Sequence, residues 1–227
     1  MYDDYNWKFD KDTIENFDSH VNSSVPLYKE FHNVAIEISK YFIRDNTKIV
    51  DIGCSTGVFL NSLKKEIDRN NEWLGIDVST SMIEECKKRY YNDNIKFILS
   101  DGFDIDYTNT SLVTFILTLQ FIPKHKREQL LQKIYNNIDV GTCIIIVEKI
   151  KSSNLEFNDI YNDLYYDFKE SQGLTPDDIL KKNRSLRGIM KPLTIDTNLS
   201  IFKKVGFSCE VNLKYCNFVM FTLVKDI

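Results

Sequence analysis

The sequence lacks the features that would place the protein in a membrane, in an oxidising compartment or on nucleic acid. Its 227 residues contain no apolar run as long as a membrane-spanning helix and no charged-then-apolar leader at the start. Its five cysteines form no CxxC pair and no regular framework, so we interpret them as reduced thiols and expect no metal site. The formal net charge of −4 provides no positive field for nucleic acid or an anionic membrane. We therefore expect a soluble, cytoplasmic protein that binds neither.

Two common nucleotide-binding patterns are absent as well. A Walker loop needs Gly-Lys-Ser or Gly-Lys-Thr, and neither tripeptide occurs in the chain. A dinucleotide fingerprint needs G-x-G-x-x-G, but in the turn that starts at Gly53 the second glycine position is Ser55. These absences argue against an NAD-dependent oxidoreductase.

What remains has the balance of an ordinary globular domain, with 43% hydrophobic and 27% charged residues. We expect one domain over residues 1–227, with residues 1–46 as an N-terminal helical cap. Residues 151–192 carry two amphipathic helices, at about 155–171 and 176–188, which we interpret as an insertion that forms a lid or a dimer interface.

The rest of the chain alternates between strands and helices. Short apolar runs rich in β-branched residues predict strands at 47–52, 73–77, 95–99, 112–119 and 143–149. Helices are predicted between them, at 58–69, 80–90 and 126–138. After a final helix at 194–205, the segments 207–215 and 217–225 leave no space for a helix, which predicts an antiparallel hairpin. The expected fold is α/β, of the class I methyltransferase (Rossmann-like) type: a mainly parallel seven-stranded sheet with a C-terminal antiparallel hairpin and helices on both faces.

A glycine turn follows the first predicted strand, with Gly53 and Gly57 four residues apart after Asp51. Glycine lets the backbone turn sharply and approach a ligand closely. In open α/β sheets the crevice beyond the carboxyl ends of the strands binds nucleotides, and the amides at the start of the next helix face it. We therefore expect cofactor contacts along this turn, from Asp51, Gly53, Cys54, Ser55 and Gly57.

Two further carboxylates end neighbouring strands. Asp77, followed by Val78, lies at the distance along the chain where a carboxylate accepts both ribose hydroxyls. Asp101, followed by Gly102, is placed to accept from an adenine amino group. With the closing hairpin, this pattern favours S-adenosyl-L-methionine as the cofactor.

Three of these residues have a structural alternative. Asp51 could instead orient the turn through backbone amides, and Asp101 could be a helix N-cap. Cys54 could be a nucleophile, but no histidine lies nearby in the sequence, so we interpret it as a structural or cofactor-contacting thiol.

Beyond the fold, the chain resembles the carboxy-S-adenosyl-L-methionine synthase family over nearly its whole length. The most diagnostic pieces are Ser24-Val25-Pro26-x-Tyr28 and Thr118-Leu119-Gln120-Phe121. Other matching pieces are Trp7-x-Phe9-Asp10, Ser81-Met82-Ile83-Glu84-x-Cys86, Glu148-Lys149, Asp167-Phe168-Lys169, Arg184-Ser185 and Asn217-Phe218.

The resemblance implies an activity and a set of roles. Members convert S-adenosylmethionine and prephenate into carboxy-S-adenosylmethionine and phenylpyruvate. The carboxy-S-adenosylmethionine is then used to modify the tRNA wobble uridine. Arg184, from the neighbouring subunit of a homodimer, and Tyr28 would be the residues at the new carboxylate. A guanidinium binds a carboxylate in a fixed two-pronged geometry, which suits that role.

The chain resembles a diverged member, because Ile116 stands where the family has a cofactor-contacting asparagine. Ser23 likewise replaces a typical arginine. An isoleucine side chain cannot donate or accept hydrogen bonds, so the alternative is a conventional S-adenosylmethionine-dependent methyltransferase acting on a small anionic metabolite. A non-catalytic module that keeps only the fold is a third possibility.

The insertion also carries a basic cluster within an acidic protein. Its members are Lys181, Lys182, Arg184, Arg187 and Lys191. The cluster predicts either an anion pocket for a carboxylate-bearing ligand or a solvated helix face.

Overall fold

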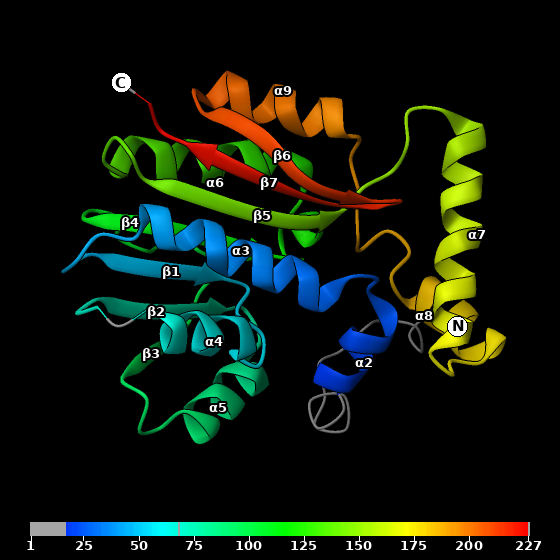
Figure 1. Cartoon of the computed structure of the whole chain (residues 1–227), viewed down its shortest axis with the longest axis horizontal. Helices are drawn as coiled ribbons and strands as arrows, with labels where there is room; N and C mark the ends of the chain where they lie inside the picture. The colour runs from blue at the N-terminus through cyan, green and yellow to red at the C-terminus, as the bar shows by residue number, and fades with distance from the viewer. Residues whose placement is uncertain (1–16, 68, 227) are drawn as a thin grey trace.

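The computed structural model describes residues 17–67 and 69–226, so the Trp7-x-Phe9-Asp10 piece lies outside the described residues. A seven-stranded sheet runs through the molecule in the order β3-β2-β1-β4-β5-β7-β6 (Figure 1). Its strands are β1 (Lys48–Ile52), β2 (Glu72–Asp77), β3 (Ile95–Leu99), β4 (Thr110–Ile116), β5 (Cys143–Lys149), β6 (Ser208–Tyr215) and β7 (Phe218–Val224). The first five are parallel, whereas β7 pairs antiparallel with both β5 and β6. The predicted fold class, including the closing hairpin, is confirmed.

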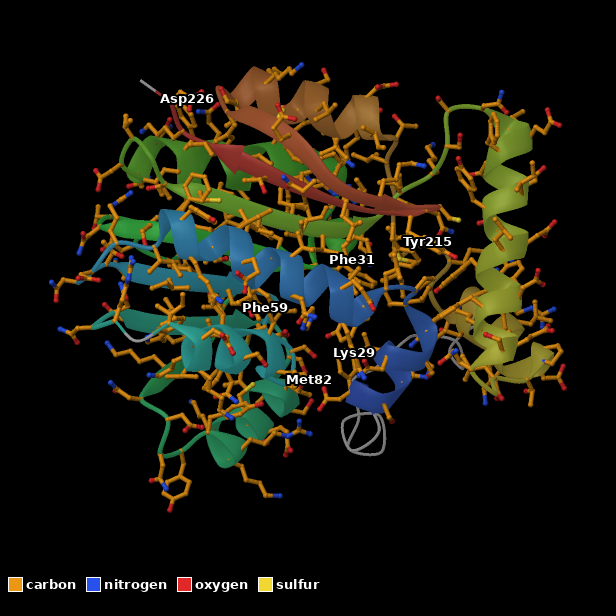
Figure 2. The ribbon with its side chains drawn as sticks, in the orientation of Figure 1. Lys29, Phe31, Phe59, Met82, Tyr215 and Asp226 are labelled. Atoms are coloured by element: carbon orange, nitrogen blue, oxygen red, sulfur yellow. The ribbon has the colours of Figure 1, made fainter. Side chains whose placement is uncertain are left out.

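Helices cover both faces of the sheet and divide the core into two layers. Phe31 and Phe59 lie in one layer, which α3, α4 and α5 cover, and Leu130 and Phe202 lie in the other, which α6 and α9 cover (Figures 1 and 2). The covering helices are α3 (Tyr28–Phe42), α4 (Val58–Glu66), α5 (Thr80–Arg89), α6 (Lys124–Asn137) and α9 (Ile195–Val205). Because both faces are covered, β4 and β5 are buried at every position except their last residues.

The fourth strand is shorter at its carboxyl end than predicted. It ends at Ile116, and Leu117 adopts a φ of 59°, which turns the chain out of the sheet. Thr118 then leads into the 3₁₀ helix η2 (Leu119–Phe121). The apolar run to 119 therefore has the sequence pattern of one strand, although its last residues bend across the edge of the sheet.

The N-terminal helix and the insertion meet beyond the carboxyl edge of the sheet. The elements are α2 (Phe17–Ser24), α7 (Leu155–Ser171) and α8 (Pro176–Ser185), and α7 contacts both of the others. Figure 1 shows α7 standing at the end of the molecule where the strands point. This arrangement closes over the strand ends from the side.

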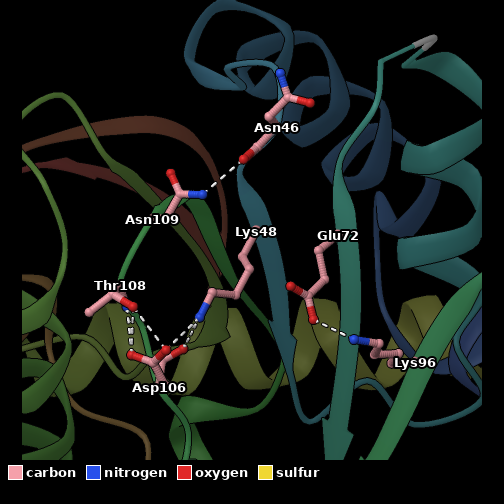
Figure 3. A network of polar contacts seen from close by, with 7 residues as sticks. All are labelled: Asn46, Lys48, Glu72, Lys96, Asp106, Thr108 and Asn109. Atoms are coloured by element: carbon pink, nitrogen blue, oxygen red, sulfur yellow. Dashed lines mark hydrogen bonds and ion pairs between the residues drawn. The ribbon is translucent and has the colours of Figure 1, made fainter.

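Surface ion pairs lie at the other end of the strands, where β1 and β2 begin (Figure 3). Lys48 at the start of β1 donates to Asp106 Oδ2 at 2.9 Å, and Lys96 Nζ lies 2.8 Å from Glu72 Oε1. Exposed pairs of this kind contribute about 0–1 kcal/mol each. Backbone pairing therefore holds these strands, and the ion pairs lie away from the carboxyl ends.

The glycine turn after β1 requires glycine at its first position. Gly53 has a φ of 72°, and a Cβ built there would lie 2.3 Å from Thr118 Cγ2 and 2.4 Å from Thr118 Oγ1. Thr118 Oγ1 in turn donates to the Gly53 carbonyl at 3.3 Å. The turn after β1 and the segment after β4 therefore pack directly against each other.

Gly53→Ala should lower the free energy of unfolding by about 2–5 kcal/mol, through the left-handed backbone and the clash with Thr118. Gly173→Ala is the matched control, because Gly173 has a φ of 89° but an added Cβ would have no heavy atom within 4 Å. It should cost only the backbone part, about 1–2 kcal/mol. Urea denaturation of both variants checks this, and equal losses would show that the clash contributes nothing.

Candidate functional site

A cavity of about 490 Å³ opens at the carboxyl ends of β1, β2 and β4. The glycine turn forms its floor, and α2, α7 and α8 enclose it on the other side. Ligand sites of doubly wound sheets lie at this place, where the strand order reverses between β1 and β4. Its volume is in the range of small-molecule pockets, about 300–1,000 Å³.

The glycine turn is attached to the neighbouring strand by its backbone. The amides of Gly53 and Cys54 both donate to the Ile76 carbonyl, at 2.8 and 2.9 Å. The Ser55 amide donates to Asp77 Oδ2 at 2.9 Å, and the Ser79 amide donates to Asp77 Oδ1 at 2.9 Å. The turn and the end of β2 therefore form one rigid surface.

Asp77 presents a fixed carboxylate to the cavity. Burial raises its pKa, while the amides of Ser79 and Ser55 oppose that shift. Each oxygen keeps a lone pair, as acceptance of two vicinal hydroxyls requires. Beside it Val78 lines the cavity with 71% of its surface exposed, which leaves an apolar face for a flat ring.

Asp101 lines the same cavity from the loop after β3. Its Oδ1 accepts from the Phe103 amide at 3.1 Å, and the described chain forms no helix between β3 and β4. The side chain therefore stabilises a turn, and the helix N-cap alternative is wrong. Gly102 lies beneath the loop, where its carbonyl accepts from the Tyr107 hydroxyl, and it is not among the cavity-lining residues.

Asp51 is buried at the inner wall of the cavity. Its Oδ1 accepts from Thr114 Oγ1 of β4 at 2.6 Å. Burial raises its pKa to about 7, with a smaller contribution from the negative charge of Asp77. The bond runs to a neighbouring strand, so the structure does not support a role in orienting the turn through backbone amides.

Cys54 also lines the cavity, and its surroundings make it a poor nucleophile. A hydrogen bond with Cys86, followed by burial, raises the pKa of the Cys54 thiol. Cys86 Sγ donates to the Ser55 carbonyl at 3.0 Å. The thiol is therefore neutral near pH 7, which agrees with a structural or cofactor-contacting role.

Tyr28 faces the cavity at the start of α3. Burial raises the pKa of its hydroxyl, so it remains a donor at neutral pH. Its ring lies 4.2 Å from the His32 ring, which lies 5.1 Å from the Phe59 ring. Burial lowers the pKa of His32 to about 4, so this histidine is a neutral packing residue.

The diagnostic Thr-Leu-Gln-Phe piece shapes the far wall. Thr118 and Gln120 line the cavity together with Ile116. Gln120 Oε1 accepts from the Lys149 amide, and the Gln120 carbonyl accepts from Arg127 Nη2 at 3.0 Å. The glutamine therefore joins η2 to the end of β5.

One end of the cavity is cationic, and of its members the sequence analysis singled out only Lys182, as part of the basic cluster. This end of the cavity is lined by Lys149, Lys182 and His20, together with Tyr165 of α7. Burial lowers the pKa of Lys149 and of Lys182 to about 7, and the charge of Lys169 adds to both shifts. One signal was available, because Lys149 ends a strand in the matching Glu148-Lys149 piece.

The structure brings most of the predicted site residues together. Those that line the one cavity are Tyr28, Asp51, Gly53, Cys54, Ser55, Asp77, Val78 and Asp101. Gly57 lies behind the turn, directly before α4, and does not line the cavity. Arg184 is exposed on α8 and does not line the cavity either. Of the basic cluster, Lys182 faces the cavity whereas Lys181 and Arg187 face solvent.

The residues present fit S-adenosylmethionine. One carboxylate at the end of β2 suits the ribose, the exposed Val78 suits the adenine face, and Asp101 lies on the same wall. The described part of the chain contains no cluster of three or more metal-ligating side chains and no helix able to cross a bilayer.

Asp51→Asn should flatten the pH dependence of stability. The folded pKa of about 7 lies above the ordinary value of 3.8, so the folded protein holds this proton more tightly than the unfolded chain. Stability from this group is present below about pH 4 and is lost as pH rises to about 7. At pH 8 the variant should therefore be more stable than the wild type by about 2–4 kcal/mol.

Urea denaturation between pH 4 and 8 measures this slope, and Asp106→Asn serves as the control. Asp106 is exposed, and hydrogen bonds from Thr108 hold its pKa at about 2. Its contribution to the pH dependence of stability therefore falls below pH 4, outside the measured range. Glu148, with a pKa of about 7, contributes to the pH dependence of stability equally in every variant. Identical slopes for wild type and Asp51→Asn would contradict the shifted pKa.

Comparison with known proteins supports the assignment of the fold. A family model described as a methyltransferase domain matches residues 49–141. The plantazolicin methyltransferase BpumL, solved with a desmethyl-plantazolicin analogue and SAH, superposes with a TM-score of 0.70 over 96% of this chain and 92% of that chain, at 15% identity. A putative O-methyltransferase from Nostoc punctiforme gives a TM-score of 0.65 at 19% identity, over 93% of this chain and 59% of that one.

Curated relatives resemble the chain far more closely. The carboxy-S-adenosyl-L-methionine synthase of Staphylococcus epidermidis is 38% identical over 226 residues, 99% of each chain. The synthase of Nautilia profundicola is 36% identical over 96% of this chain and 94% of that protein. The chain belongs to the carboxy-S-adenosyl-L-methionine synthase family.

Proposed function

We propose that the protein converts S-adenosylmethionine and prephenate into carboxy-S-adenosylmethionine and phenylpyruvate. The observation that carries the proposal is a single cavity with a carboxylate end and a cationic end. Asp77 and Asp101 lie at one end and Lys149 and Lys182 at the other. A nucleoside sulfonium and a small dianionic acid are the partners that these two ends suit, and relatives at 38% and 36% identity carry the synthase name.

The residues of this chain bind and orient the reactants. Asp77 accepts from the ribose hydroxyls and Asp101 from the adenine amino group. The backbone from Gly53 to Ser55 lies against the rest of the cofactor, and the neutral Tyr28 hydroxyl donates to the new carboxylate. Holding two reactants at reacting distance removes most of the entropic barrier to their encounter.

When bound, S-adenosylmethionine would supply the activated methyl group, whose carbon would exchange a proton for the carbon dioxide that prephenate releases. Prephenate aromatises as it loses that carbon dioxide, and its departing hydroxide takes the proton to form water. Ile116, Leu117 and Phe218 line the cavity with apolar surface, which suits uncharged carbon dioxide.

Arg184 is proposed to act from the neighbouring subunit of a homodimer. Its side chain is exposed on α8 and outside its own cavity, which a residue that acts in a partner's site would be. The neighbouring α7 exposes large apolar side chains suited to such an interface, namely Leu155, Phe157, Ile160 and Leu164.

The product would serve modification of the tRNA wobble uridine by a second enzyme. We propose that the protein acts in the cytoplasm together with that enzyme. No direct contact with tRNA is proposed, because the chain is acidic, with a formal net charge of −4.

A conventional methyltransferase is the second candidate, and Ile116 favours it. This side chain lines the cavity where the synthase family has an amide. The loss removes hydrogen bonds at the cofactor but leaves the glycine turn, Asp77 and the cationic end in place. Such an enzyme would methylate a small anionic metabolite without using prephenate.

Mass spectrometry of the ligand that copurifies with the protein separates the two candidates. We expect a species heavier than S-adenosylmethionine by one carbon dioxide. Purified protein supplied with both reactants should form that species and phenylpyruvate in equal amounts. Turnover of S-adenosylmethionine with prephenate present, but without phenylpyruvate, would exclude the synthase.

Mixed subunits test the placement of Arg184. Neither Arg184→Ala nor Asp77→Ala alone should give the carboxylated product, because one lacks the carboxylate partner and the other the ribose partner. Coexpressed, they should recover about a quarter of wild-type activity or less, since a mixed dimer holds one complete site.

Arg187→Ala is the matched control, because Arg187 is an exposed neighbour after α8, and it should keep full activity. Absence of recovery in the mixture, when each variant still folds and dimerises, would place Arg184 in its own site. Product formation by Arg184→Ala alone would show that Arg184 has no role in either site.

A further inference from the structure

Two ammonium groups lie close to the ring of Tyr165 on α7. Lys149 Nζ is 4.0 Å from the ring centroid and Lys169 Nζ is 4.2 Å from it. Lys149 comes from the carboxyl end of β5, and Lys169 lies one helical turn after Tyr165. Two elements far apart in the sequence therefore converge on one aromatic ring.

Two further groups complete this cluster at the cavity. Lys182 lines it from α8 and His20 lines it from α2. Burial lowers the pKa of His20, and the charges of Lys182 and Lys169 lower it further, whereas Asp178 opposes them. We call Lys149, Lys169, Lys182 and His20 the cationic cluster.

Ion pairs do not balance the two lysines beside Tyr165. In the described ranges, neither Lys149 nor Lys169 forms an ion pair. Lys169 is only 5% exposed, and burial lowers its pKa to about 8. The acid that faces the cluster, Asp178, is exposed and already accepts from Thr175.

Such a cluster costs stability, because partly desolvated like charges are held together with aromatic rings beside them. Cation–π contacts of about 0.5–2 kcal/mol offset part of that cost. A ligand anion would balance the charge of Lys149, and the cavity gives it access to both Lys149 and Lys182.

We infer that Lys149 and Lys182 bind the carboxylates of a small dianionic acid, and that Lys169, which contacts the same Tyr165 ring as Lys149, adds to their positive field. The inference deepens the proposed function and takes from it the identity of the acid, prephenate. Within one chain it assigns substrate binding to β5, α7 and α8, apart from Asp77 and Asp101 at the cofactor end.

The arrangement also favours release of the product. Prephenate carries two carboxylates, and phenylpyruvate keeps one after decarboxylation. The cluster therefore binds the substrate more tightly than the product, by the attraction of one charge in a partly desolvated site. A cluster of several lysines suits this discrimination better than a single cation.

Lys149→Met and Lys182→Met test the inference, since methionine keeps most of the length of the side chain without the charge. Each should raise the KM for prephenate about 10- to 100-fold, as expected for loss of a hydrogen bond between charged groups. The dissociation constant for S-adenosylmethionine, measured by calorimetry, should change less than about twofold, because the cofactor end is untouched.

Lys181→Met is the matched control: it removes the same charge from the adjacent, exposed position on α8. It should leave both constants unchanged. Lys149→Met should in addition keep or raise the melting temperature of the ligand-free protein, since it relieves repulsion from Lys169. A lysine with a purely structural role would lower the melting temperature.

Thermal shift with prephenate and with phenylpyruvate separates this inference from the proposed function. Wild type should be stabilised more by prephenate, and Lys149→Met should lose most of that difference. If wild type forms no carboxylated product but shows this pattern, the dianion site stands and the synthase reaction fails. If wild type forms product while both variants keep the KM within about twofold of the wild-type value, the site is wrong and the reaction stands.

Discussion

One hydrogen bond from the backbone to a side chain organises the site: the amide of Ser55 donates to the carboxylate of Asp77. It joins the turn after β1 to the end of β2, and the paired bonds from Gly53 and Cys54 to the Ile76 carbonyl hold the same junction. Without this junction the two strand ends would be separate loops. With it, a carboxylate and a row of turn atoms face one cavity in a fixed geometry, and the surrounding elements are placed against that surface.

Charge is separated along the cavity. The carboxylates lie on β1, β2 and the loop after β3, whereas Lys149 and Lys182 come from β5 and the insertion, and Lys126 lines the cavity from α6. Burial works on both sets, since it raises the pKa of Asp51 and lowers the pKa of Lys149 towards the same value, about 7. A cavity of this kind suits the cationic sulfonium and the anionic acid of the proposed reaction.

Much of this could be predicted from the sequence because strands, helices and caps depend on local patterns. The alternation of elements, the closing hairpin, and the positions of Asp77 and Asp101 at strand ends all follow from residue type and spacing. The fourth strand was predicted too long, because its apolar pattern continues past Ile116 while Leu117 turns the chain out of the sheet and Thr118 packs against Gly53. Lys149 and Tyr165 have no sequence relation that could reveal their contact.

The sequence by itself determined the fold class, the nucleotide edge of the sheet and the family, because short motifs carry each of them. Only the tertiary structure decided which charged residues share the cavity. It brings Lys182 into the lining and leaves Arg184 and Lys181 outside, although the three lie on one short helix. The reason is geometric: the side of α8 that faces the cavity is set by its packing against α7, which lies far from the glycine turn in the chain.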